Sequence, residues 1–374
     1  MPSVGDVLRR FGPAYLAHFL LRMPPEQKKV LQALIACRTG QLGTVRYHCS
    51  SCGRRHVMGP SCGNRHCPSC QQHQTRAWLD KQTSRLLPCP YFLITFTVPK
   101  ELRRFIRRHP REGYRAMFAA SSDALKTLAA DPRFVGATRF GFFGVLHTWG
   151  RRLTTYHPHI HYVVPGGGVS PDGSRWLPAR DDLFVHVKPL SVLYRRKLKK
   201  AFGRAGLLDQ IDPAVWNKEF ITDSRAVGDG RTSLQYLAPY VFRVAITDRR
   251  IVSIQEQKDG SGRVTYLYKK SRTTHWRKQT VDALEFIRGF LQHVLPSGFQ
   301  KVRHYGFLHP QAKPGIEAVR WMVAIHYGRQ YLLLVHVQRV TIPPPAVSCP
   351  DCGGAMVLTG FTPPVRAPPF GRAA

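Results

Sequence analysis

Three histidines alternate with other residues in the stretch TTYHPHIHYVVPGGG, which spans residues 154–168. Side chains of an extended strand alternate between its two faces, so a strand here would place His157, His159 and His161 on one face and Ile160 in the core. Imidazoles two residues apart can converge on one divalent ion, leaving positions for a third ligand, water and a phosphate oxygen. A metal held in this open way polarises a phosphodiester. The alternative is a polar stripe on an ordinary strand.

The third metal ligand is expected from a histidine close to this strand. His147 lies in RFGFFGVLHTW (residues 139–149), whose aromatic and β-branched content is typical of a preceding strand. It is the best-placed third ligand, and His157 is the alternative. A half-buried, hydrogen-bonded histidine is the competing interpretation of His147.

Two tyrosines supply a candidate nucleophile in the stretch SLQYLAPYVFRVAI. Tyr236 and Tyr240 are four residues apart, so a helix places both on one face. Tyrosine can act as a covalent nucleophile, but its ordinary pKa is near 10. A metal-bound phosphate and a basic neighbour such as Arg243 would help it attack. The alternative is that both rings pack in the core.

The elements that would position these residues mix helices and strands. The sequence predicts an α+β fold: an N-terminal helical plus zinc-ribbon-like module, then a domain with a central antiparallel sheet flanked by helices. The expected domains are residues 1–88, 89–300 and 301–374, the last with a disordered Pro-rich tail. An amphipathic helix is expected over residues 281–294, with Thr280 as its N-cap.

Two Cys-x2-Cys pairs indicate a structural zinc site. Cys49, Cys52, Cys67 and Cys70 are expected to converge on one ion, each pair presenting two sulfurs from a tight turn that Gly53 suits after Cys52. Substitutes for these ligands, or a partial second site, could come from four nearby residues: His56, Cys62, His66 and His73.

A third pair, Cys349 and Cys352, lies near the C-terminus and is followed by two glycines. It is either half of a site completed elsewhere or a remnant. Cys37 and Cys89 are interpreted as ordinary buried thiols.

The charge of the chain favours a polyanionic partner. It has 56 Lys and Arg against 22 Asp and Glu, a formal net charge of +34 spread over segments that should fold. Nucleic acid is the commonest such partner, and Arg151 and Arg152 beside the histidine strand are candidate DNA contacts. A ribosome-associated or membrane-surface protein is the alternative. The sequence shows neither a signal peptide nor a membrane-spanning run, so we expect a cytoplasmic location, with the nine cysteines as thiols or metal ligands.

Several stretches together resemble the two-tyrosine HUH transposases of rolling-circle insertion sequences, the insertion-sequence-ninety-one type. They are SCGNRHCPSCQ, LHTWG, HPHIHYVVPGGG, YLAPYVFRVAI and HVLPSGFQKVRHYGFL, and the resemblance covers roughly residues 5–355. It implies an N-terminal zinc-binding domain and a catalytic domain that cuts single-stranded DNA and becomes joined to its 5′ end. It implies His159 and His161 as ligands of Mg²⁺ or Mn²⁺, and Tyr236 and Tyr240 as nucleophiles.

The resulting functional hypothesis is a transposase that nicks and rejoins single-stranded DNA at element ends and targets through a 5′-phosphotyrosine. A rolling-circle replication initiator or relaxase would use the same chemistry. A non-catalytic zinc-ribbon DNA-binding regulator is the alternative from another class. The glycines at 166–168 either let the DNA backbone approach or form a plain tight turn.

Overall fold

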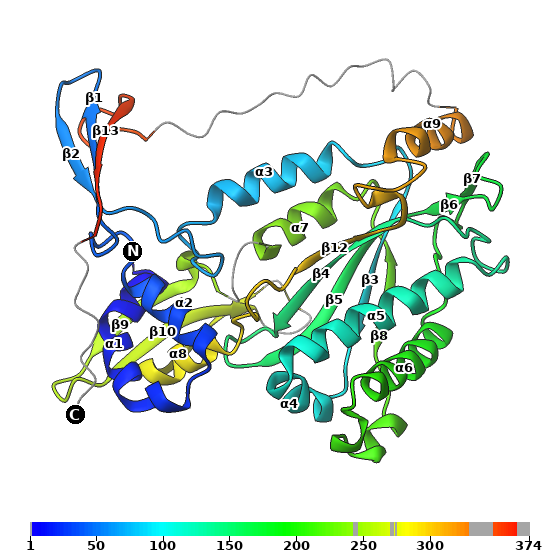
Figure 1. The fold of residues 1–374 in the computed structure, drawn as a ribbon, viewed down its shortest axis with the longest axis horizontal. Coiled ribbons are helices and arrows are strands. Elements are labelled where there is room, and N and C mark those ends of the chain that lie inside the picture. The colour runs from blue at the N-terminus through cyan, green and yellow to red at the C-terminus, as the bar shows by residue number, and fades with distance from the viewer. Residues whose placement is uncertain (1, 242–245, 270–272, 274, 329–346, 365–374) are drawn as a thin grey trace.

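The computed structural model describes residues 2–241, 246–269, 273, 275–328 and 347–364. Its centre is a five-stranded sheet in the order β12-β4-β5-β3-β8 (Figure 1), in which every neighbouring pair is antiparallel. This confirms the expected α+β fold with a central antiparallel sheet. The strands are β3 (Tyr91–Thr97), β4 (Phe142–Trp149), β5 (Tyr156–Pro165), β8 (Thr222–Ala226) and β12 (Val302–Tyr305).

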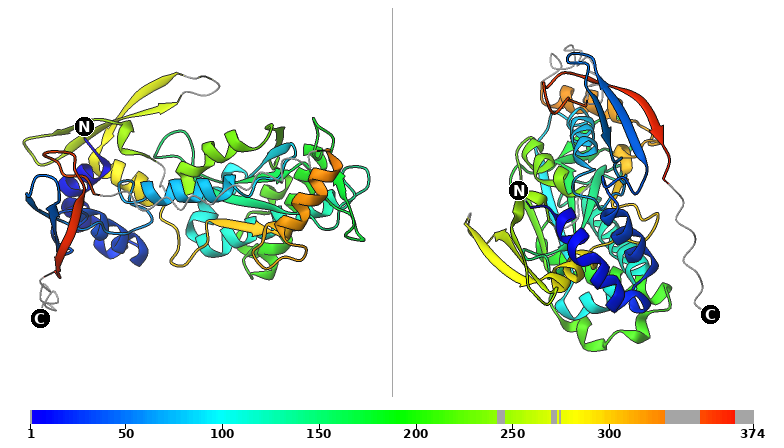
Figure 2. Two further views of the ribbon diagram at one scale, coloured as in Figure 1. Left: turned by 90° about the horizontal axis from the view of Figure 1, so that it is seen from above. Right: turned by 90° about the vertical axis from the view of Figure 1, so that its left-hand side faces the viewer.

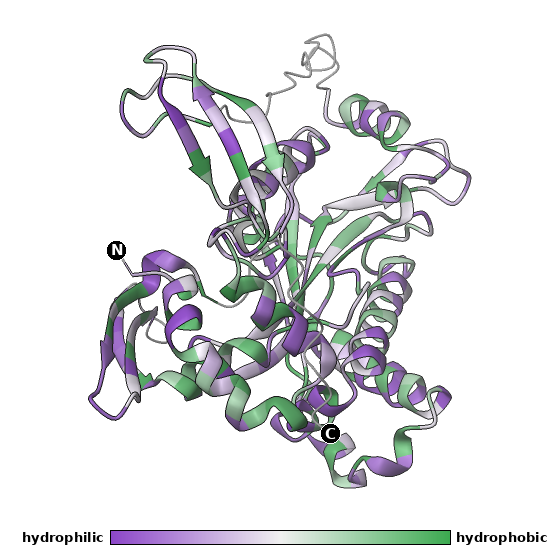
Figure 3. Cartoon of the chain, turned by 60° about the vertical axis from the view of Figure 1, so that its left-hand side comes forward, coloured by the Kyte–Doolittle hydropathy of each residue, from purple (hydrophilic) through white to green (hydrophobic). Residues whose placement is uncertain are grey.

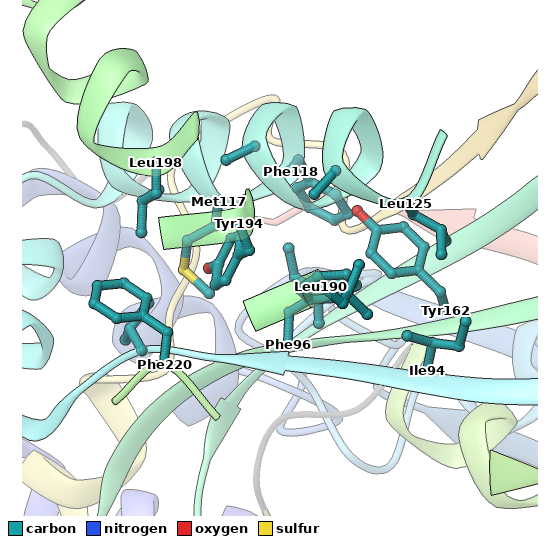
Figure 4. Close-up of a cluster of buried hydrophobic side chains, with 14 of the residues drawn as sticks. Ile94, Phe96, Met117, Phe118, Leu125, Tyr162, Leu190, Tyr194, Leu198 and Phe220 are labelled. Atoms are coloured by element: carbon teal, nitrogen blue, oxygen red, sulfur yellow. The ribbon is translucent and has the colours of Figure 1, made fainter. Parts of the chain in front are cut away.

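One face of this sheet carries the largest hydrophobic core, which α4 (Lys100–Arg108), α5 (Pro110–Ala129) and α6 (Val187–Arg204) cover. Ile160 and Tyr162 of β5 belong to this core, and Figure 4 shows Tyr162 among its buried side chains. The Tyr162 ring covers Gly144 of β4, where an added Cβ would lie 2.3 Å from a ring carbon. Because side chains alternate along β5, its even-numbered residues pack in the core beneath α5 and α6.

The opposite face carries α3 (Gln72–Thr83), α7 (Arg231–Val241) and α9 (Ile316–His326). Leu234 and Leu237 of α7 are fully buried against Val145 and Val163 of the sheet. Helix α3 packs on α7 in turn. The odd-numbered residues of β5 therefore lie beneath α7.

A second lobe joins the N-terminal helices to a segment from late in the chain. Helices α1 (Val4–Phe19) and α2 (Pro25–Ile35) share a core with α8 (Ala283–Leu291) and with the antiparallel sheet of β9 (Ile251–Glu256), β10 (Gly262–Lys269) and β11 (Trp276–Asp282). The expected cap of α8 was wrong. Thr280 belongs to β11, and the Asp282 carboxylate accepts hydrogen bonds from the backbone N–H groups of Leu284 and Glu285.

A third, small sheet has the order β13-β1-β2, formed by β1 (Thr44–Cys49), β2 (Arg55–Met58) and β13 (Met356–Thr362). We call it the ribbon. It lies at the end of the molecule opposite the hairpin of β6 (Gly167–Val169) and β7 (Trp176–Pro178), as Figures 1 and 2 show. Figure 3 shows hydrophilic and hydrophobic residues mixed along the ribbon, whereas the central strands are mostly white to green.

Short 3-10 turns complete the described elements: η1 (Leu20–Arg22), η2 (Leu208–Gln210), η3 (Pro213–Asn217), η4 (Asp248–Arg250) and η5 (Gly306–Leu308). No helix among the described residues is long and apolar enough to cross a membrane. The limits at 88 and 300 stay predictions, although β12, beyond residue 300, pairs with β4. The Pro-rich tail from residue 365 falls outside the described residues.

The glycines after β5 approach protein, not solvent. Gly166, Gly167 and Gly168 are all buried, and an added Cβ at Gly167 would lie 2.4 Å from the Leu177 carbonyl oxygen of β7. Gly167 also has φ +153, where side chains are strained. The close partner is the chain's own backbone, so the suggested approach of a DNA backbone at these glycines was wrong.

Candidate active site

Three histidines from two paired strands meet on the α7 side of the central sheet. His147 of β4 lies directly opposite His159 of β5 in the antiparallel register, and His161 follows two residues later on the same face. The ring centroids are 5.2 Å apart for His147 and His159, 4.7 Å for His147 and His161, and 4.8 Å for His159 and His161. One nitrogen from each ring lies within 4.8 Å of those from the other two, a spacing that suits one metal ion.

His157, the alternative third ligand, is not part of this cluster. Its ring lies 5.0 Å from that of His159, but the group of three that can share an ion contains His147 instead. His157 contributes its backbone, because its carbonyl oxygen lies 2.7 Å from Nδ1 of His159.

Hydrogen bonds orient two of the rings for binding. A carbonyl oxygen only accepts, so Nδ1 of His159 must carry the proton and donate to His157, which leaves a lone pair on Nε2. Nδ1 of His161 lies 2.9 Å from Oγ1 of Thr95 on β3. The buried Nε2 of His161 has no hydrogen-bond partner among the described residues. A buried imidazole nitrogen in this state is suited to a metal bond, because nothing else there offsets its desolvation.

The surroundings keep these rings neutral. Burial lowers the pKa of His159 to about 4, and burial also holds the pKa of His147 and His161 well below the ordinary value. Imidazole binds metal in its neutral form. All three rings are therefore in the ligating state at neutral pH.

Tyr236 faces the histidines from α7. Its ring centroid is 6.2 Å from that of His161, with the rings perpendicular, and half of its surface is exposed. The neighbouring Leu234 and Leu237 are buried, so amphipathic packing of α7 turns the phenol toward the site. The expectation that at least one phenol faces the imidazoles is confirmed.

The other candidates lie around this centre or outside the described part. Tyr240 lies in the last turn of α7, but its side chain is outside the described residues, as is Arg243. Arg151 and Arg152 are exposed in the β4–β5 connection, and Arg152 lies 5.1 Å over the Tyr268 ring. Their roles toward DNA remain predictions.

The cysteines divide between two clusters, and the predicted single site of Cys49, Cys52, Cys67 and Cys70 was wrong. Cys67 and Cys70 meet two other cysteines, Cys37 and Cys62. Cys49 and Cys52 meet the C-terminal pair. The physical reason is the fold: the strand pairing of β1 with β13 brings Cys349 and Cys352 to the end of β1.

The first cluster has the geometry of a tetrahedral zinc site. Sulfur atoms of Cys37 and Cys70 are 3.4 Å apart, and those of Cys37 and Cys67, and of Cys62 and Cys70, are 3.8 Å apart. Zinc–sulfur bonds of ~2.3 Å in a tetrahedron require sulfur separations near these values. The four residues fit a structural zinc ion that would tie the end of α2 to the start of α3.

Sequence reasoning missed Cys37 as a member of a cluster and left Cys62 as a substitute. Nothing local marks Cys37, which follows α2 as a buried thiol. For the second cluster a signal did exist. Cys52 and Cys352 are each followed by glycine, whereas Cys70 is followed by Gln71. Two Cys-x2-Cys pairs that are each followed by glycine are expected to form matching turns, and matching turns indicate that Cys49–Cys52 and Cys349–Cys352 share one site.

Comparison with known proteins matches two parts of the chain to transposase families. Residues 7–98 match a family model described as a transposase zinc-binding domain, and residues 141–314 match one described as "Putative transposase". The second range contains all three histidines and both tyrosines. No solved structure matches the chain.

Two curated relatives cover most of the chain. The "Putative transposase y4qJ" of Sinorhizobium fredii is 38% identical over 82% of this chain and 80% of its own length. The "Transposase for insertion sequence element IS801" of Pseudomonas savastanoi pv. phaseolicola is 29% identical over 74% of this chain and 68% of its own length. The chain belongs to the IS91 family of transposases.

Proposed function

We propose that the protein nicks and rejoins single-stranded DNA, with the hydroxyl of Tyr236 or Tyr240 as nucleophile and His147, His159 and His161 as ligands of a Mg²⁺ or Mn²⁺ ion. The observation that carries the proposal is the position of the Tyr236 ring, 6.2 Å from His161 on the same side of the sheet as the three imidazoles. A core-packing role would not leave half of this ring exposed.

The chemistry follows from the roles of these groups. The bound ion would polarise the scissile phosphate and orient it. The tyrosine oxygen loses its proton to solvent, attacks phosphorus and displaces the 3′ oxygen, which leaves as a hydroxyl after taking a proton. The enzyme is then joined to the 5′ phosphate. Attack by a free 3′ hydroxyl reverses the step and releases the tyrosine, so no energy source is needed.

Basic and aromatic side chains gather around Trp149, which lies two residues after His147 on β4. A cavity of about 780 Å³ is lined by Arg65, Lys301, Arg303, Trp78 and Trp149, among others. Trp149 stacks on His147 with ring centroids 5.0 Å apart, and the Lys301 ammonium group lies 4.7 Å from the Trp149 ring centroid. The guanidinium groups of Arg65 and Arg303 suit phosphate oxygens, and the half-buried Trp78 ring suits stacking on a base.

Covalent capture tests the proposal. A single-stranded oligonucleotide from an element end is incubated with the protein and Mn²⁺, then denatured and examined for a slow-migrating protein–DNA band. Tyr236→Phe and Tyr240→Phe each keep the ring and remove one oxygen, so a single variant can still form the adduct, but neither should complete transposition. The double variant should form no adduct. Tyr47→Phe in the ribbon is the matched control and should react normally. An adduct in the double variant would place the nucleophile elsewhere.

A replication initiator or relaxase would give the same adduct. The two are separated by the DNA rejoined afterwards. A transposase joins the captured element end to a target strand, whereas an initiator or relaxase reseals its own origin strand. The family membership of the chain supports the first. A non-catalytic regulator would give no adduct at all.

A further inference from the structure

We propose that a second zinc ion binds Cys49, Cys52, Cys349 and Cys352, and that it fastens the C-terminal strand β13 to strands β1 and β2 of the ribbon. We call this site the clasp. It is independent of the proposed function, because none of its residues lies near the histidine face. Residues 349 and 352 also lie outside the matched zinc-binding domain, which ends at residue 98.

The sulfur positions are those of a tetrahedral ion site. The Cys49 and Cys352 sulfurs are 3.5 Å apart and the Cys52 and Cys349 sulfurs are 3.8 Å apart, and all four lie within 4.8 Å of one another. A disulfide requires ~2.05 Å between two sulfurs and would group them as pairs. Four mutually close thiols are instead the ligand set of structural zinc.

The two halves of the clasp have the same backbone turn. In each, the N–H of the first cysteine donates to the carbonyl five residues later, at 2.8 Å for both Cys49 and Cys349. In each, the glycine after the second cysteine donates back to the first cysteine's carbonyl, at 3.0 Å for Gly53 and 2.9 Å for Gly353. These glycines have φ +73 and +74, which only glycine adopts freely. Two matching turns that each aim two sulfurs at one point make a closed site.

Polar side chains surround the four sulfurs of the clasp. Nε2 of His56 lies 3.3 Å from the Cys349 sulfur. Arg54 pairs with Asp351 at 3.1 Å, and Nε2 of His56 lies 3.5 Å from the same carboxylate. Because the Arg54 charge is paired with Asp351, the contribution of these neighbours is to orient the ligands through contacts such as that of His56 with the Cys349 sulfur.

The ribbon also needs such a bond. Its core consists of Cys49, Cys349 and Met356, with Tyr47 and Met58 partly buried beside them. A three-stranded sheet with so little apolar burial does not hold itself together in water. Among the described residues, β13 makes its extensive contacts with β1 alone. Without the ion, six register pairs would be left to hold the C-terminal strand.

Metal stoichiometry of the full-length protein tests the clasp. We expect the native protein to bind one zinc ion more per chain than Cys349→Ser/Cys352→Ser, whatever the histidine site holds. Cys89→Ser, which removes a buried thiol outside both clusters, should bind as many zinc ions as the native protein. Equal zinc content in the native protein and the double variant would overturn the proposal.

Thiol reactivity separates the clasp from a disulfide or a folding defect. Cys52 and Cys352 are exposed, so they should react with N-ethylmaleimide at once if free and only after chelation if they hold zinc. In Cys349→Ser/Cys352→Ser, Cys49 and Cys52 should become reactive without chelator as the ribbon loosens, while the helical part of the far-ultraviolet circular dichroism stays native. Immediate reaction in native protein, or a Cys49–Cys352 disulfide found by mass spectrometry, contradicts the clasp.

Discussion

The histidine face and the cysteine clusters each contain pairs of residues two or three apart, yet they assemble over different distances along the chain. All three histidines lie within residues 147–161, on two strands joined by one short connection. The cysteine clusters join α2 to α3 and, at the clasp, residues 303 apart. Local strand geometry determines the first arrangement, whereas tertiary folding determines the second. We therefore expect the histidines to govern activity and the cysteines to govern stability.

The largest effect is expected from Cys62→Ser in the first cluster. Loss of one ligand removes much of a binding free energy of ~10 kcal/mol for structural zinc, which is comparable to the whole stability of a typical domain. The variant should lose one zinc and should unfold or aggregate on expression. Cys89→Ser should remain folded. Native thermal unfolding of Cys62→Ser would show that the cluster does not contribute to folding.

His159→Ala should separate activity from stability. We expect cleavage to fall at least ~100-fold, because a metal that neutralises developing charge contributes several kcal/mol to the rate. Binding of single-stranded DNA should persist and weaken steeply with salt, since it depends on many Lys and Arg contacts. His186→Ala, an exposed histidine at the start of α6, is the control. An unchanged cleavage rate for His159→Ala would refute the metal role of the histidine face.

Thr95→Val tests whether the hydrogen bond to Nδ1 of His161 positions that ring. The substitution keeps the shape and removes the hydroxyl. Loss of such a partner typically lowers metal affinity by ~10–100-fold. The Mn²⁺ concentration for half-maximal cleavage should rise by that factor, while cleavage at saturating Mn²⁺ stays near the native rate. A lower rate at saturation without a change in metal dependence would favour a purely structural role.

The smallest effect concerns a buried histidine that belongs to neither region. Burial lowers the pKa of His293 to about 4, and its Nε2 lies 2.8 Å from the Leu153 carbonyl oxygen. Because the folded pKa is below the unfolded value of ~6.5, its contribution is complete above pH 6.5 and is lost as the pH falls toward 4. The unfolding free energy should decrease by about 2 kcal/mol from this group between pH 7 and pH 5. His293→Gln should show a shallower decrease in urea titrations at both pH values.

The sequence predicted side-chain positions correctly where the two-residue repeat of a strand determines which face each residue occupies. Alternation in β5 correctly separated Ile160 from His159 and His161, because a strand has only two faces. The position of His147 followed from a two-strand hairpin, although Thr95 on β3 could not be foreseen without the register of a third strand.

The grouping of the cysteines could not be predicted from sequence spacing. The pairs at 49–52 and 67–70 are neighbours in sequence, and proximity suggested one site. Their separation depends on β1 pairing with β13, and strand pairing at that distance has no local signature. The glycine that follows both Cys52 and Cys352 was the available clue. It shows that the two pairs form the same kind of turn, however far apart they lie in the sequence.

The span of the clasp bears on how the protein is made. Cys52 and Cys349 are 297 residues apart, and ribosomes add ~5–20 residues per second. The ribbon's first two thiols would therefore wait about 15–60 seconds for their partners after they leave the ribosome. During that interval β1 has an unpaired edge and an incomplete ligand set. A prematurely terminated chain would keep this half-formed ribbon, so the clasp distinguishes finished molecules from fragments that already contain every histidine and tyrosine of the active site.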